Sequence, residues 1–176
     1  MSEEKRLAVG TDLQQYVSFF LGDEEYGVDI AKVHEIIRFP EITRVPQMPE
    51  FIDGVINLRG RVIPVMNLRK KFALPIIDDN NKRRIIVIEI DKKITGVIVD
   101  GVSEVLNIES VNIDPAPQMG TQVSIDFIKG MAKLSDERLM ILLNIERILS
   151  SDEMQQLKTV GENEAGENSL DSEEAA

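Results

Sequence analysis

Short runs of hydrophobic residues, separated by clusters of turn-forming residues, dominate the chain. YVSFFL (Tyr16–Leu21), RRIIVIEI (Arg83–Ile90) and ITGVIVD (Ile94–Asp100) are rich in β-branched or aromatic residues and have the length of strands. Gly22–Glu25 and Asp91–Lys93 provide turn chemistry between such runs. We expect about five strands in each half of the chain and no long helices between them. This pattern predicts a mainly β fold of small barrels and argues against a parallel α/β sheet.

One hairpin and three short helical segments complete the predicted elements. VINLRGRVIPVMNL predicts a hairpin with Arg59 and Gly60 at its tip, because Gly60 is free to adopt a positive φ. Asn67 and Asn144 each precede a segment of one helical turn, for which asparagine is a good N-cap. Ser150–Leu157 starts with a serine cap followed by acidic residues, and this predicts a short C-terminal helix at 150–157.

The second half of the chain repeats the first. GVDIAKVHEII (Gly27–Ile37) aligns with GVIVDGVSEVL (Gly96–Leu106), and FIDGVINLRG from Phe51 has its counterpart in FIKGMAKLSD from Phe127. VMNLRKKF aligns with LLNIERIL further on, in the same order. Chance is a poor explanation for matched blocks in one order, so we infer an internal duplication. Only the first copy carries Asn-Leu-Arg-Gly, with Arg59.

The duplication predicts two five-stranded β-barrels, residues 14–80 and 81–149. A half of this size buries little core alone, so the barrels should share an apolar interface, and an exchange of strands between them is possible. Residues 158–176 are predicted to be a disordered acidic tail. From Ser150 onward the chain holds eight acidic residues and one basic residue, and from Thr159 onward it has no apolar period.

Composition excludes several function classes. The chain of 176 residues has a net charge of −11 and no cysteine, so it has no disulfide or zinc–sulfur site. No apolar run is long enough to span a membrane, and the N-terminus lacks a signal sequence, so we expect a cytoplasmic protein without membrane insertion. His34 is the only histidine, and the motifs of nucleophiles, phosphate loops and metal sites are missing. We therefore predict no enzyme activity, cofactor or metal.

A nucleic-acid-binding barrel is an alternative of a different class. Basic residues gather between Arg59 and Arg84, but stacking aromatic residues are not interleaved with them, and the net charge is negative. We therefore predict no nucleic-acid partner. What remains is an intracellular two-barrel protein that binds other proteins.

Five segments resemble the CheW family of bacterial chemotaxis. These segments are Leu21–Ile37, Phe51–Phe72, Thr95–Ile108, Pro115–Gln118 and Phe127–Leu149. Asn-Leu-Arg-Gly followed by Ile-Pro-Val and Asn-Leu-Arg is nearly a signature. The resemblance implies two SH3-like barrels. It also implies an adaptor that couples the cytoplasmic tips of methyl-accepting chemoreceptors to the regulatory domain of the histidine kinase CheA, in ternary complexes and array rings at the membrane. An adaptor of another receptor–kinase pathway, such as surface motility, is the alternative.

The resemblance also implies which residues bind each partner. It assigns kinase binding to Ile36, Phe39, Glu35 and Arg59. It assigns receptor binding to Val33, Gly54, Arg59, Val99, Val102 and Val105. Structural roles are the alternatives: a solvated turn for Arg59, an ion pair for Glu35, a backbone requirement for Gly54 and core packing for most of the valines. If Glu35 pairs with Arg59, both interpretations hold for these two residues.

Overall fold

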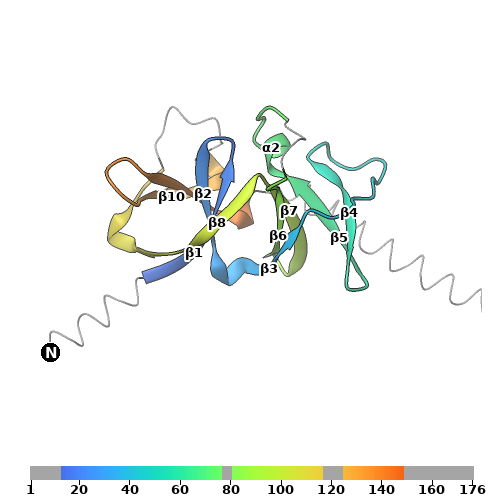
Figure 1. Cartoon of the computed structure of the whole chain (residues 1–176), viewed down its shortest axis with the longest axis horizontal. Coiled ribbons are helices and arrows are strands. Elements are labelled where there is room, and N and C mark those ends of the chain that lie inside the picture. The colour runs from blue at the N-terminus through green and yellow to red at the C-terminus, as the bar shows by residue number, and fades with distance from the viewer. Residues whose placement is uncertain (1–12, 77–80, 117–124, 149–176) are drawn as a thin grey trace, which may run out of the picture.

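The computed structural model describes residues 13–76, 81–116 and 125–148. The predicted C-terminal helix at 150–157 and the acidic tail at 158–176 lie outside the described residues. Most of the described chain forms two β-sheets that lie side by side, as Figure 1 shows.

A six-stranded sheet forms one side of the molecule. Its strands, in hydrogen-bonded order, are β8 (Gly101–Glu109), β1 (Leu13–Leu21), β2 (Glu24–Asp29), β11 (Leu139–Leu143), β10 (Ile128–Lys133) and β9 (Ile113–Asp114). Neighbouring strands are antiparallel except β2 and β11, which are parallel.

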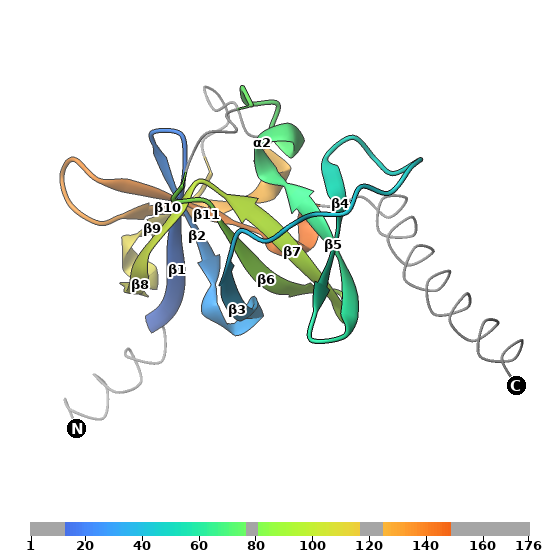
Figure 2. The same ribbon diagram turned by 45° about the vertical axis from the view of Figure 1, so that its right-hand side comes forward.

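A five-stranded sheet forms the other side. Its strands, again in hydrogen-bonded order, are β3 (Val33–Arg38), β6 (Arg84–Ile90), β7 (Lys93–Val99), β5 (Arg61–Asn67) and β4 (Ile52–Leu58). Only β5 and β7 pair in parallel. In Figure 2 the β4–β5 hairpin lies on the side of the molecule away from the six-stranded sheet.

Short helical turns connect the strands. The α-helix α2 (Leu68–Lys71) follows β5, and the Asn67 side chain accepts hydrogen bonds from the backbone N–H groups of Arg69 and Lys70, as the predicted cap requires. Asn144 instead precedes a 3-10 turn, and its side chain makes no capping hydrogen bond. The 3-10 turns are η1 (Ile30–Lys32), η2 (Ser110–Asn112), η3 (Ile125–Phe127) and η4 (Ile145–Arg147).

The mainly β fold with a short helix is confirmed, but the sheets differ from the predicted five-stranded barrels. One strand order ends at β8 and β9 and the other at β3 and β4, so neither sheet closes into a barrel within the described residues. The six-stranded sheet also gains the two-residue strand β9.

The predicted boundary at residue 80 does not separate the two sheets. β1 and β2 come from the first predicted half, 14–80, but pair with strands of the second. β6 and β7 come from the second half, 81–149, and pair with strands of the first. The two halves therefore exchange strands.

The repeat in the sequence recurs in the strand pairing. In the five-stranded sheet, β5 and β7 place Val65 opposite Gly96. In the six-stranded sheet, β11 and β2 place Leu142 opposite Gly27. Gly27 and Gly96 are aligned in the repeat, as are Val65 and Leu142. Each parallel pair therefore joins one strand of each half at equivalent positions.

Three clusters of buried hydrophobic side chains form the core. The inter-sheet cluster contains side chains of both sheets, including Phe19 and Tyr26 from one sheet, Ile86 from the other and Phe72 after α2. The five-strand cluster consists of Ile56, Ile63, Val65, Ile85, Val87 and Ile98. The six-strand cluster consists of Tyr16, Ile108, Ala132, Met140 and Leu142.

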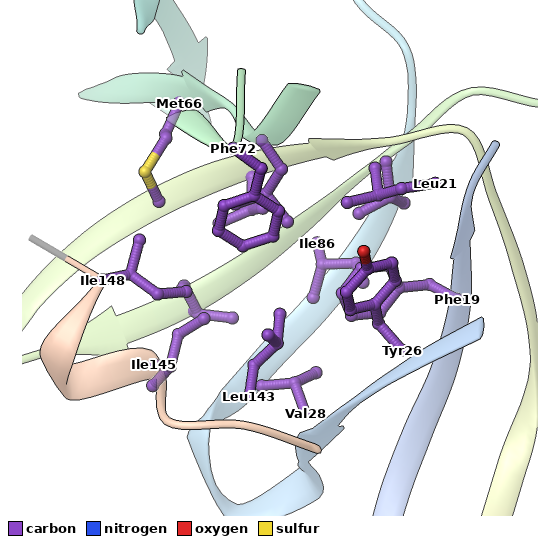
Figure 3. Close-up of a cluster of buried hydrophobic side chains, with 14 of the residues drawn as sticks. Phe19, Leu21, Tyr26, Val28, Met66, Phe72, Ile86, Leu143, Ile145 and Ile148 are labelled. Carbon is purple, nitrogen blue, oxygen red and sulfur yellow. The ribbon is translucent and has the colours of Figure 1, made fainter. Parts of the chain in front are cut away.

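Figure 3 shows how the inter-sheet cluster joins the sheets. The rings of Phe19 and Tyr26 stack with their centroids 5.8 Å apart, and the Tyr26 and Phe72 centroids are 6.0 Å apart. Full burial of one such side chain stabilises the fold by about 1.5–3 kcal/mol. The predicted shared apolar interface is therefore present.

A buried ion pair also joins the sheets. The Arg69 guanidinium after β5 donates two hydrogen bonds to Asp100, which lies between β7 and β8, and the one from Nε measures 2.9 Å. The backbone N–H of Gly22, in the β1–β2 turn, donates to the same carboxylate at 2.6 Å. Burial acts to raise the pKa of Asp100, but the hydrogen bonds from Arg69 and Gly22 outweigh it and lower the pKa.

Candidate partner-binding surface

Strand β3 presents one apolar side chain to solvent. Residues along a strand alternate between its faces, and Ile37 packs on the five-strand cluster while Ile36 is 40% exposed. Ile36 lies opposite the buried Ile86 of β6, on the face of the sheet that carries the inter-sheet cluster. Because β3 is an edge strand, the six-stranded sheet leaves this side chain uncovered.

Glu35 and Arg59 form the ion pair anticipated from the sequence. Arg59 Nη1 lies 2.5 Å from Glu35 Oε2, and the Arg59 side chain is 75% exposed. Its backbone has a φ of +52° in the hairpin turn, followed by +85° at Gly60. Asn57 Oδ1 accepts a hydrogen bond from the Gly60 N–H at 2.8 Å and holds the turn. The hydrogen bond and charge of Glu35 raise the pKa of Arg59.

Phe39 follows β3 and is half-buried against the five-strand cluster. The guanidinium carbon of Arg83 lies 3.9 Å from the centre of its ring, in a cation–π contact. Phe39 therefore offers a partner only part of its ring. Its setting differs from that of Ile36, which extends into solvent.

The four valines assigned to the receptor lie in different environments. Val33 and Val102 are partly buried against the inter-sheet cluster, while Val99 is fully buried within it. Val105 on β8 is 51% exposed. Val99 thus presents no surface to a partner in this conformation, and of the four only Val105 is largely accessible.

The backbone conformation and the close packing at position 54 require a glycine. Its φ is +152°, and a Cβ atom there would lie 2.1 Å from the carbonyl oxygen of Thr43. Thr43 bridges to Val55 in the same region, with the Val55 N–H donating to the Thr43 carbonyl at 2.8 Å. Gly130 is crowded in the same way, by the carbonyl oxygen of Asp114. These contacts favour the backbone interpretation of Gly54.

Among the other exposed apolar residues, two on equivalent hairpin strands of the two copies were missed. Val62 on β5 is 40% exposed and Leu139 on β11 is 53% exposed. They occupy equivalent positions in the repeat, as do Ile36 and Val105. Their alternation with the buried Ile63 and Met140 was a signal available in the sequence.

The second copy has an ion-pair cluster that the sequence did not indicate. Arg138 in the β10–β11 turn reaches Glu104 at 3.3 Å, and Glu104 is the counterpart of Glu35. Arg138 also donates two hydrogen bonds to the buried Glu25, at 2.8 and 2.7 Å. The hydrogen bond from Arg138 lowers the pKa of Glu25 despite its burial. The hairpin arginine of each copy therefore pairs with an equivalent glutamate, although the two arginines do not align.

Within residues 13–76, 81–116 and 125–148, no three His, Cys, Asp or Glu side chains gather where they could bind a metal ion. His34 lies exposed on β3. In the same ranges, no helix is both long and apolar enough to cross a membrane.

Comparison with known proteins identifies the family. The family model described as the CheW-like domain matches residues 15–153. The chain is 41% identical to the chemotaxis protein CheW of Klebsiella aerogenes over 149 residues, which cover 85% of this chain and 89% of that protein. Identity to the chemotaxis protein CheW of Helicobacter pylori is 36% over 141 residues, covering 80% and 84%.

A solved structure agrees with the observed fold. The crystal structure of the scaffolding protein TtCheW from Thermoanaerobacter tengcongensis superposes with a TM-score of 0.73 at 38% identity, covering 80% of this chain and 90% of that one. The match of family model, relatives and fold spans most of the chain. The chain therefore belongs to the CheW family.

Proposed function

We propose that this chemotaxis adaptor couples methyl-accepting chemoreceptors to the histidine kinase CheA through packed protein surfaces and without catalysis of its own. The membership of residues 15–153 in the CheW-like family is the observation that carries the proposal. The protein works in the cytoplasm, where its partners recruit it to receptor arrays beneath the membrane.

The kinase surface is centred on the edge strand β3. Ile36 supplies an exposed apolar anchor, and Phe39 adds the accessible part of its ring. The exposed Glu35–Arg59 pair supplies charges whose hydrogen-bonding capacity is only partly used. Apolar anchors and arginines are both common among interface hot spots.

The receptor surface includes Val105, Val102, Val33 and the neighbourhood of Gly54. Val105 is the accessible contact, while Val33 and Val102 border the inter-sheet cluster. Arg59 belongs to both surfaces, so the turn that carries it links the two partners. Val99 supports the receptor surface from the core beneath it, because its side chain is buried.

The two sheets are the products of one duplicated SH3-like unit. The equivalent parallel pairs Val65–Gly96 and Leu142–Gly27 support this origin. Such a molecule presents similar surfaces twice, and the regulatory domain of CheA is expected to pair with it pseudo-symmetrically.

The test is the affinity of CheA for an Ile36→Asp variant. Because Ile36 is 40% exposed, the variant should unfold at the same temperature as the wild type. Its binding should weaken by about 2 kcal/mol or more, which is about thirtyfold. Val111→Asp is the matched control, because Val111 is 79% exposed and lies on η2, outside the proposed surfaces.

Calorimetry with purified CheA measures the affinity, and co-sedimentation with receptor-containing membranes reports ternary complexes. Equal affinity of CheA for the two variants would remove Ile36 from the kinase surface. If the wild-type protein neither sediments with receptor and kinase nor changes kinase activity, the adaptor function itself is wrong.

A further inference from the structure

A cleft borders the proposed kinase surface at Phe39, which lines it. It has a volume of about 540 Å³ and lies between the β3–β4 connection, the strands β4 and β5, and the residue before β6. Phe39, Ile42 and Ile76 supply apolar lining, and Arg44 and Arg83 supply positive charge. The cleft therefore combines apolar walls with cationic groups.

Arg83 is the unusual group in this cleft. Its Nε atom is buried, and no hydrogen-bond partner for it exists in the part of the chain that the structure describes. The guanidinium lies over the ring of Phe39, and both residues line the cleft. A buried donor without a partner is costly, and a carboxylate is the acceptor that matches a guanidinium best.

The acidic groups of the cleft do not supply that acceptor. Asp53 lines the cleft, and its Oδ1 is 2.7 Å from Lys70 Nζ in an ion pair without hydrogen-bond geometry. Its Oδ2 accepts a hydrogen bond from Asn67 Nδ2 at 3.1 Å. Glu41 is exposed at the rim, as is Arg44, so their charges offset each other there. The charge of Asp100 interacts with Arg83 from outside the lining, but among the described residues the Arg83 Nε–H still has no acceptor.

The chain itself carries a concentrated source of carboxylates. Ile148, the last described residue, packs in the same cluster as Ile52, and Ile52 also lines the cleft. The 28 residues that follow Ile148 can extend up to about 90 Å, so they reach the cleft easily. From Ser150 onward they carry a net charge of −7. Attachment to the same chain raises their effective concentration at the cleft.

We propose that the cleft is a carboxylate-binding site and that the acidic segment 158–176 of the same chain occupies it. One carboxylate of the segment accepts hydrogen bonds from the Arg83 guanidinium. The apolar stem of that residue contacts Ile42 and Ile76. Arg44 at the rim attracts neighbouring acids of the segment through its charge.

Paramagnetic NMR on the full chain tests the occupancy. The chain has no cysteine, so a nitroxide attached to Ser169→Cys labels the segment at one place. At low salt we expect loss of the backbone amide signals of Ile42 and Arg44, and of the Arg83 Nε–H signal. High salt should restore these signals, since exposed charges are screened.

Two comparisons make the experiment specific. In the labelled chain, the six acids of the segment are replaced by their amides: Glu162, Glu164, Glu167, Asp171, Glu173 and Glu174. In a second labelled chain, Arg83→Gln should lower the equilibrium constant for occupancy of the cleft by the segment by about tenfold. In a third, Arg61→Gln removes an exposed charge outside the cleft and should leave this constant unchanged. If Arg83→Gln fails to fold, Arg44→Gln takes its place.

The outcomes separate the possible occupants. Signal loss confined to the cleft, and abolished by the amide substitutions, supports the proposal. Signal loss that persists after those substitutions overturns it. If the nitroxide has no effect but added acetate shifts the Arg83 Nε–H signal, the site binds carboxylates of a partner, and the acidic segment is not the occupant.

Discussion

At the residue scale, the role we propose for the Glu35–Arg59 pair is in binding rather than in stability. Its guanidinium is largely in water, and exposed ion pairs add little to the free energy of folding. Its position is nevertheless well defined, because the hairpin turn and Asn57 hold the backbone of Arg59. A charge held in a defined position suits recognition of a partner.

Reversal of the Arg59 charge tests this role. Arg59→Glu should leave the thermal midpoint nearly unchanged and weaken kinase binding by about tenfold or more, because it places two carboxylates side by side. Adding Glu35→Arg in the same molecule should restore part of the affinity. Thermal melts and calorimetry on both variants provide the measurement, with Arg61→Glu as the control. If the double variant binds no better than Arg59→Glu alone, the pairing does not contribute to binding.

At the element scale, the β4 bulge sets the path of the chain between β3 and β4. The register shifts between Ile52 and Gly54, and the same shift occurs between Ile128 and Gly130 in β10. At each bulge a glycine lets another backbone carbonyl approach closely. The Thr43 segment, which continues into the wall of the cleft, is thereby fixed against β4.

Gly54→Ala should therefore disturb the whole connection. The new methyl group would meet the Thr43 carbonyl, and backbone strain and overpacking together should destabilise the protein by about 2–4 kcal/mol. Gly60→Ala is the matched control. Its φ of +85° is also positive, but no atom lies within 4 Å of the added Cβ, so its cost should be about 1 kcal/mol at most. Urea unfolding compares the two, and equal losses would contradict the steric explanation.

At the scale of the whole molecule, two kinds of contact hold the sheets together. The inter-sheet cluster supplies apolar area without directional preference, while Arg69 and Asp100 fix a specific point of contact near Gly22. The Arg69 and Asp100 side chains are only 9% and 13% exposed, so neither charge is well solvated once its partner is lost.

This ion pair makes stability depend on acid pH. The folded-state pKa of Asp100 lies below its ordinary value of 3.8, so its contribution is fully present above about pH 4 and is lost as the pH falls through the lower folded value. Asp100→Asn should cost about 3 kcal/mol at pH 7 and make the decline toward pH 3 shallower. Asp91→Asn, in an exposed turn, is the control. Urea unfolding across this pH range measures the effect, and parallel pH profiles for wild type and Asp100→Asn would exclude Asp100 as the titrating group.

Local residue chemistry accounts for the parts of the fold that were predicted correctly. The strand-length apolar runs, the Arg59–Gly60 turn and the Asn67 cap depend on neighbours in sequence, so they follow from propensity and periodicity. The internal repeat was also visible, because equivalent backbone paths require similar residues at matched positions.

Strand partners, side-chain exposure and long-range ion pairs depend on residues far apart in the chain, so they emerge only in the folded molecule. The parallel pairing of β2 with β11 and of β5 with β7 exchanges strands between the halves, and no local signal specifies such partners. Ile36 and Val99 are both apolar strand residues, yet one lies on an uncovered edge and the other in the inter-sheet cluster. Arg138 reaches both Glu25 and Glu104 because the folded chain brings β2, β8 and the β10–β11 turn to one point. Local sequence therefore specifies which segments become strands and where the chain turns between them. The packing of the two sheets specifies which faces of those sheets remain accessible to partners.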